Sequence, residues 1–118
     1  MTFANVCANN EQLSLLSHLL LSAFPGCTIH QSRDPMRTMQ HLSNQKIDAV
    51  FADADTCSSW IHIFRKHDSY PTVFLLCSQE QAQQKEAEDI HGVVTYPITK
   101  QKIQNLLQTR LQEVREVI

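Results

Sequence analysis

The stretch Ala49-Val50-Phe51-Ala52-Asp53 indicates the fold of this chain. Four apolar residues in succession suit a short buried strand, and the turn-like segment 54–59 follows them directly. Asp53 is therefore expected at the exit of that strand. In open α/β sheets, binding and reactive groups gather at the carboxyl ends of the strands.

Similar apolar runs recur on both sides of this stretch and alternate with helical patterns. In the expected strand Thr72–Cys77 the apolar residues from Val73 onward are continuous, which predicts burial on both faces and a parallel sheet. Five alternations of strand and helix predict a doubly wound α/β sandwich with right-handed crossovers. The expected strands are Phe3–Cys7, Cys27–His30, Ile47–Ala52, Thr72–Cys77 and Val93–Thr95.

Capping signals mark where several helices begin. Asp34 and Pro35 suit the N-cap and first positions of one helix, and Ser78 with Gln81 forms a capping box for another. Trp60 is expected to pack a third helix onto the sheet, and a helix after Ser78 is expected to end near Ile90.

The length and charge of the chain limit the number of domains and the kinds of partner that it can have. Its 118 residues fit one domain, 1–118, with enough chain to bury a core. The formal net charge of -2 gives no electrostatic argument for direct contact with nucleic acid or a membrane surface. We find no bilayer-spanning apolar stretch and no signal-peptide pattern at the N-terminus, and so expect a cytoplasmic protein.

Residue counts also exclude several kinds of site. The four cysteines show no paired ligand spacing, which favours reduced core residues over a zinc site. The two glycines cannot supply a glycine-rich phosphate loop. No histidine pairs with a carboxylate at ligand spacing, so packing is the expected role of all six.

The segment Lys46–Asp53 resembles the third strand of two-component receiver domains, in which an aspartate opens the strand and the phospho-accepting aspartate lies five residues later. Asp48 and Asp53 have that spacing. Ser78 is similar to the hydroxyl residue after the fourth strand, and Gly92–Pro97 is similar to the segment that ends in Lys-Pro. The order of elements agrees over essentially the whole chain.

The resemblance implies a flavodoxin-like (βα)5 sandwich with five parallel strands in the order 2-1-3-4-5. It also implies that Asp53 is the phospho-acceptor position and the ligand of any Mg²⁺. The surrounding pocket would hold the following residues: Asn9, Asn10, Asp55, Ser78, Tyr96 and Pro97.

This sequence departs from the family pattern at the acidic pair and the lysine that phosphoryl transfer needs. The acidic pair after the first strand is replaced by Ala8 and Asn9, or by Asn9 and Asn10 with a shift of one residue. Tyr96 stands where the family has a lysine, and its hydroxyl is a weaker hydrogen-bond donor than an ammonium group. Phosphoryl transfer depends on such cations, so phosphorylation is expected to be slow or absent.

The favoured hypothesis is a degenerate receiver domain that is not an enzyme and needs no cofactor. It would act through protein contacts, with a sensor histidine kinase or other signalling protein as partner and a transcriptional output domain beyond it. One alternative is an active receiver that binds Mg²⁺ and is phosphorylated on Asp53. A lower alternative is a flavodoxin-like domain that binds a small ligand such as a flavin.

Structural roles remain open for the same residues. Asp53 could cap the following turn without being reactive, while Ser78 and Asn9 suit helix N-caps.

The last helix, within 98–118, gives the clearest sign of a partner. Its apolar stripe continues into the distal turn, where the sheet should have ended. We expect it to contact a second copy of the chain or to lead into an output domain, although a frayed end is an equal alternative. The predicted interface residues are Ile103, Leu107, Leu111 and Val114.

Overall fold

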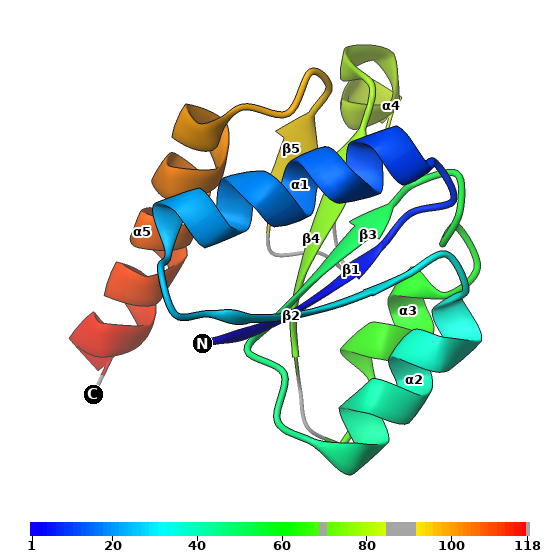
Figure 1. The fold of residues 1–118 in the computed structure, drawn as a ribbon, viewed down its shortest axis with the longest axis horizontal. Helices are drawn as coiled ribbons and strands as arrows, with labels where there is room; N and C mark the ends of the chain where they lie inside the picture. The colour runs from blue at the N-terminus through cyan, green and yellow to red at the C-terminus, as the bar shows by residue number, and fades with distance from the viewer. Residues whose placement is uncertain (69–70, 85–91, 118) are drawn as a thin grey trace.

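Five parallel strands form one sheet in the order β2-β1-β3-β4-β5 (Figure 1). The structure is a computed structural model that describes residues 1–68, 71–84 and 92–117, without the side chains of 83–84 and 109–117. The strands are β1 (Thr2–Val6), β2 (Thr28–Ser32), β3 (Ala49–Asp53), β4 (Thr72–Cys77) and β5 (Gly92–Thr95). The predicted α/β sandwich and its strand order are confirmed.

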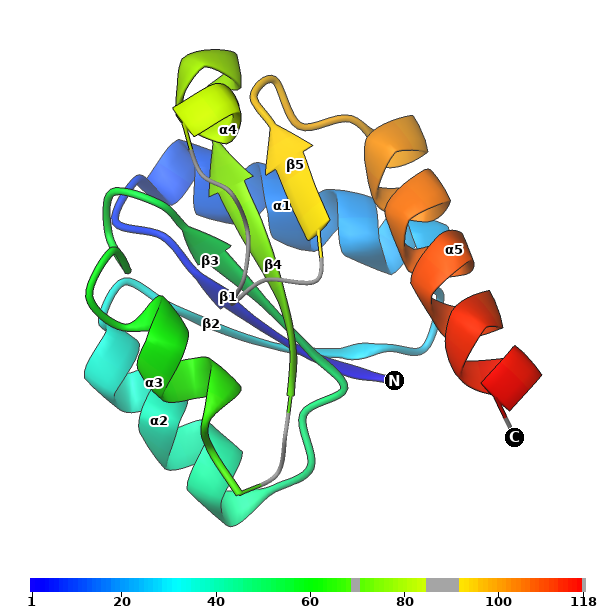
Figure 2. The same ribbon diagram turned by 180° about the vertical axis from the view of Figure 1, so that it is seen from behind.

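Helices cover both faces of the sheet. The helices are α1 (Asn10–Ala23), α2 (Pro35–Asn44), α3 (Ile61–Arg65), α4 (Gln79–Gln84) and α5 (Lys100–Val117). The helices α1 and α5 lie together on one face, and α2 and α3 lie on the other (Figures 1 and 2). In the described part of the chain, no helix is long and apolar enough to cross a membrane.

The predicted helix starts are largely confirmed. Asp34 caps α2 by accepting a hydrogen bond from the Met36 amide, with Pro35 at the first position. Ser78 and Gln81 form the reciprocal capping box, since each side chain accepts from the other residue's backbone amide. Trp60 precedes α3 and packs against the core. The predicted end of the fourth helix near Ile90 lies outside the described residues.

Four of the five strands have boundaries that differ from the sequence prediction by one or two residues. The first strand begins and ends one residue earlier than expected, and the fifth begins one residue earlier. The second strand begins one residue later than expected and continues to Ser32, because residues 28–32 pair in register with β1 along its whole length. The third strand begins at Ala49 and includes Asp53, which pairs with Leu76 of β4. Asp53 is thus the last residue of the strand and not the first residue of the turn.

The pleat of the strands divides the core into two clusters, one on each face. Along β3, Val50 and Ala52 pack toward α2 and α3, whereas Ala49 and Phe51 pack toward α1 and α5. The Phe51 ring lies 6.0 Å from that of Phe3 and 5.2 Å from that of Phe74, measured between ring centroids. Both faces of the central strands are therefore buried, as their continuous apolar runs predict.

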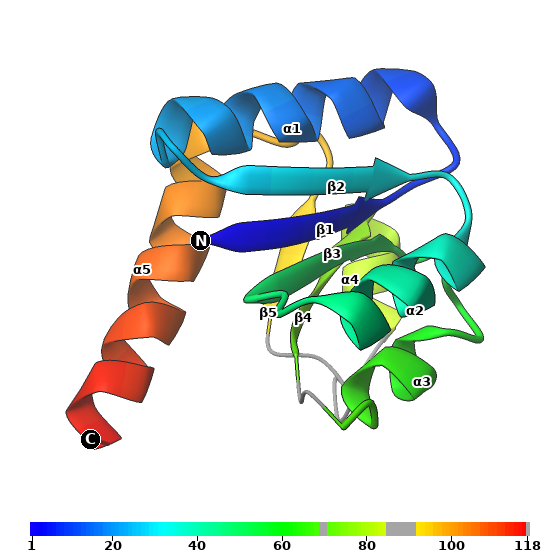
Figure 3. The same ribbon diagram turned by 60° about the horizontal axis from the view of Figure 1, so that its bottom comes forward.

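Part of the predicted α5 interface belongs to this core. Ile103 is fully buried and Leu107 is 2% exposed, and both pack against the sheet under α5. Their prediction as interface residues is wrong, because packing on the sheet leaves them no surface to offer a partner. The side chains of Leu111 and Val114 lie outside the described residues. The backbone of α5 extends beyond the sheet at its carboxyl end (Figure 3).

We predict that Phe51→Ala lowers the free energy of unfolding by about 3–5 kcal/mol, because the truncation leaves a cavity between the Phe3 and Phe74 rings. Chemical denaturation monitored by circular dichroism measures the loss. Leu21→Ala is the matched control, since Leu21 on α1 is 50% exposed and its truncation should change stability by less than about 0.5 kcal/mol. Equal losses in the two variants would contradict this description of the core.

Candidate functional site

Asp53 lies at the carboxyl edge of the sheet, in the middle of the strand order. Only 8% of its surface is exposed. The β3 strand ends between the loop that follows β1 and the strand β4, so neighbouring loops surround the carboxylate. The sequence-based placement of Asp53 at this edge agrees with the structure.

Both carboxylate oxygens of Asp53 accept hydrogen bonds from the chain itself. Oδ2 accepts from the Thr56 backbone amide at 3.0 Å and from the Thr56 hydroxyl at 2.9 Å. Oδ1 accepts from the Tyr96 hydroxyl at 2.5 Å. The Thr56 bonds are those of an Asp capping the following turn, as the structural alternative predicted.

Tyr96 reaches Asp53 from the end of β5. Its backbone amide donates to the Cys77 carbonyl at 2.9 Å, which aligns the residue with the edge of β4. The peptide bond between Tyr96 and Pro97 is cis. Burial, and then the hydrogen bond and charge of Asp53, raise the pKa of the Tyr96 phenol far above its ordinary value. Tyr96 is consequently a neutral hydrogen-bond donor at physiological pH.

Two buried thiols accompany the carboxylate. Burial chiefly raises the pKa of Cys57 to about 12, and the charge of Asp53 adds to the effect. Burial likewise raises the pKa of Cys7, with a smaller contribution from Asp53. Both thiols are free and stay protonated at neutral pH, so they are poor nucleophiles.

The other predicted pocket residues are engaged elsewhere. Asn9 caps α1 by accepting from the Gln12 amide at 3.1 Å, and Ser78 accepts from the Gln81 amide at 3.1 Å. Asp55 is exposed, and its Oδ1 accepts from the Gln81 side-chain amide at 2.7 Å. Asn10 lines a hollow beside Arg33.

Lys102, which lies near this edge of the sheet, is hydrogen-bonded to residues other than Asp53. The Lys102 ammonium group donates to the carbonyls of Thr95 and Pro97, at 3.0 Å in each case, and to the Thr95 hydroxyl at 3.2 Å. It therefore stabilises the loop between β5 and α5. Pro97 contributes its carbonyl to that loop, and its side chain is exposed.

Comparison with solved structures identifies the architecture. The chain is similar to the signal receiver domain of an HD domain-containing protein from Pseudomonas fluorescens Pf-5, with 20% identity, a TM-score of 0.80, and coverage of 98% of this chain and 89% of the other. It is also similar to the chemotaxis response regulator CheY4 of Vibrio cholerae, with 20% identity, a TM-score of 0.74, and coverage of 96% and 97%. The fold is that of a receiver domain.

A third receiver, from the DNA-binding response regulator protein merR of Colwellia psychrerythraea 34H, shows the same likeness. Its identity is 14%, its TM-score is 0.79, and the alignment covers 95% of this chain and 98% of the other. No protein-family model matches the sequence, and no curated protein matches it. At these identities the likeness establishes the receiver fold.

The donor set at Asp53 does not fit the Mg²⁺ ion that receiver domains imply. Mg²⁺ prefers carboxylate and water oxygens in octahedral geometry. Here the Asp53 oxygens are hydrogen-bonded to Thr56 and Tyr96, and the Asn9 oxygen caps a helix. Within residues 1–68, 71–84 and 92–117, no group of three or more His, Cys, Asp or Glu side chains is placed to hold a metal ion.

Thr56 is the site residue that the sequence reasoning missed. Its hydroxyl donates to Asp53 and accepts from the Ala8 amide at 3.0 Å, so it connects the loops after β1 and β3. The signal for the first contact is the spacing of three residues between Asp53 and Thr56, which suits a capped turn. The contact with Ala8 spans 48 residues and carries no local signal.

We predict that Tyr96→Phe lowers the free energy of unfolding by about 1–3 kcal/mol, because it leaves a buried carboxylate oxygen of Asp53 without its donor. Denaturant titration at neutral pH measures the loss. In an Asp53→Asn background the same substitution should cost less, since the charged acceptor is gone. A change within about 0.5 kcal/mol of wild type would contradict a stabilising role for this hydrogen bond.

The same variant has a second expected effect at alkaline pH. The pKa of Tyr96 is raised in the folded state, whereas a tyrosine in the unfolded chain titrates near about 10. The stabilisation by the Tyr96 hydroxyl is complete below that pH and declines above it, by about 1.4 kcal/mol per pH unit. The difference in stability between wild type and Tyr96→Phe should therefore shrink above about pH 10.

Proposed function

We propose that this chain is a receiver-like regulatory domain that acts in signal transduction through protein contacts and does not use Asp53 as a working phospho-acceptor. The receiver fold over nearly the full length of the chain supports the general role. The occupied carboxylate of Asp53 supports the loss of phosphorylation.

The hydrogen bonds of Asp53 are the observation that carries this proposal. A carboxylate that accepts a phosphoryl group must present a free oxygen in line with the leaving group. One Asp53 oxygen is bound by Tyr96 and the other by two donors from Thr56. Freeing either oxygen breaks hydrogen bonds to a charged group, each worth about 1.5–3 kcal/mol.

Charge around the carboxylate supports the same conclusion. Phosphoryl transfer proceeds through a transition state whose negative charge is stabilised by metal ions and basic side chains. By the resemblance, Tyr96 with its neutral phenol stands at the position of the family lysine, and Ala8 and Asn9, or Asn9 and Asn10, stand where the acidic pair is expected. The ammonium group of Lys102 is held by Thr95 and Pro97.

We expect no gain of a phosphoryl group when the purified chain is incubated with Mg²⁺ and acetyl phosphate, as measured by intact mass spectrometry. Beryllofluoride should likewise leave the Asp53 and Thr56 amide resonances unchanged. A phosphoryl adduct in wild type that disappears in Asp53→Asn would refute the proposal and favour an active receiver.

A rebuilt pocket provides the positive control. The triple variant Ala8→Asp, Asn9→Asp and Tyr96→Lys restores two acids and one cation around Asp53. Asp is as good an N-cap as Asn, so α1 should keep its start. We expect this variant to gain a phosphoryl group that the further substitution Asp53→Asn removes.

The partner of the domain forms a second part of the proposal. The relatives differ in what accompanies their receivers, as the HD domain-containing protein and the DNA-binding response regulator illustrate. For this chain we propose contact with a sensor kinase, an output domain or a second copy, made through the distal part of α5. The extension of the α5 backbone beyond the sheet supports this choice.

We predict a homodimer in light scattering at high protein concentration. The double substitution Leu111→Glu and Val114→Glu should shift it to monomer, because charge at an apolar interface is costly to bury. Leu15→Glu, on the exposed part of α1, is the control and should leave the mass unchanged. A strict monomer in the wild-type protein would exclude the homodimer.

A further inference from the structure

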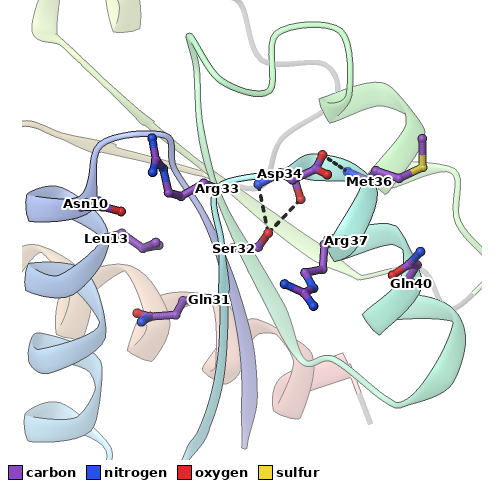
Figure 4. Close-up of a pocket in the computed structure, with 9 residues that line it drawn as sticks. All are labelled: Asn10, Leu13, Gln31, Ser32, Arg33, Asp34, Met36, Arg37 and Gln40. Carbon is purple, nitrogen blue, oxygen red and sulfur yellow. Dashed lines mark hydrogen bonds between the residues drawn. The ribbon is translucent and has the colours of Figure 1, made fainter.

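A hollow of about 510 Å³ opens between the beginning of α1, the end of β2 and the first turns of α2. Figure 4 shows the side chains that line it, with Arg33 and Arg37 on opposite sides of Ser32. This volume lies within the range of roughly 300–1,000 Å³ that is usual for small-molecule sites. Nothing in the receiver resemblance or in the chemistry of Asp53 assigns it a role.

The lining of the hollow carries a net positive charge. Arg33 and Arg37 contribute two guanidinium groups, and Asp34 contributes one carboxylate, whose Oδ1 accepts from the Met36 amide at 3.0 Å. In the described part of the chain, the guanidinium group of Arg37 makes no hydrogen bond and no ion pair with an acidic side chain. The Arg33 Nε donates to the Ala8 carbonyl at 3.1 Å, which orients its guanidinium group.

Each of the two guanidinium groups that line the hollow is suited to bind an oxyanion. Arginine presents planar, permanently charged donors that match carboxylate and phosphate oxygens. Leu13 and Met36 add apolar surface beside them, so the lining can also contact the carbon skeleton of a ligand. A concave, partly apolar site with a few charged groups is typical of small-molecule recognition.

We propose that this hollow binds a small molecule bearing phosphate or carboxylate groups, with Arg37 contacting one anionic group and Arg33 contacting another on the opposite side of Ser32. Such a ligand would give the domain an input that does not require phosphorylation of Asp53. Asp53 is not among the residues that line the hollow, so the proposed binding does not depend on whether Asp53 is phosphorylated.

His41 offers a sensitive report of ligand binding. Its ring stacks on that of His30, with 4.7 Å between ring centroids. Burial, and then the electrostatic influence of the neighbouring His30 and Arg37, lower the pKa of His41. An anion bound to Arg37 offsets part of the positive charge of Arg37, so the pKa of His41 should rise when the site is filled.

The experiment titrates the full chain with inorganic phosphate and, separately, with citrate, at constant ionic strength in sodium chloride. Nuclear magnetic resonance follows the Arg33 and Arg37 side-chain signals and the pKa of His41. We expect saturable shifts with at least one probe, accompanied by a rise in the pKa of His41. Saturation with phosphate alone or citrate alone identifies the preferred anionic group and supports the proposal.

Substitutions test the assignment of the contacts. Arg37→Gln should weaken binding at least about tenfold, and Arg33→Gln provides an independent second variant. Lys46→Gln is the matched control, because it removes one exposed positive charge at the other end of α2 and should leave the affinity unchanged. Absence of saturation with both probes, or equal weakening in Arg37→Gln and Lys46→Gln, would overturn the proposal.

Discussion

The hydrogen bonds to Asp53 hold together the carboxyl edge of the sheet. Thr56 binds the carboxylate from the loop after β3, and Tyr96 binds it from the end of β5. The Thr56 hydroxyl also accepts from Ala8, whose carbonyl accepts from Arg33. One buried acid thereby connects loops from strands that are not adjacent.

The hydrogen-bond donors that surround Asp53 are all uncharged. Neutral phenol, hydroxyl and amide groups satisfy the carboxylate oxygens without cancelling a full charge. They suit a single buried anion, but a second anion brought close to Asp53 would be repelled. The receiver fold is compatible with these hydrogen bonds to Asp53, because the fold depends on the packed sheet and the hydrogen bonds depend on a few loop residues.

The fold could be predicted from sequence because its causes are local and repeated. Continuous apolar runs at 49–52 and 72–77 mark strands buried on both faces, and caps such as Asp34 and Ser78 mark where helices begin. The position of Asp53 follows from the same pattern. The prediction that Ile103 and Leu107 contact a partner is wrong, because an apolar helical stripe has the same sequence pattern whether it packs on its own sheet or on another protein.

The site was less predictable, because its contacts join residues that are distant in sequence. The hydrogen bond of Tyr96 to Asp53 spans 43 residues, and that of Ala8 to Thr56 spans 48. The likeness to receivers suggested the first pairing by position. No sequence pattern indicated the second, nor the approach of Arg33 and Arg37 to one hollow.

The hydrogen bonds of Ala8 to Thr56 and Arg33 cannot be recognised by comparing sequences. It participates through its main-chain amide and carbonyl, and its methyl group takes no part in either hydrogen bond. Nearly any residue can supply those atoms, and only proline, which lacks the N–H group, would remove the donor. The residue at position 8 can therefore change while both hydrogen bonds are kept. Two chains can share this part of the architecture even when their sequences are no longer recognisably similar.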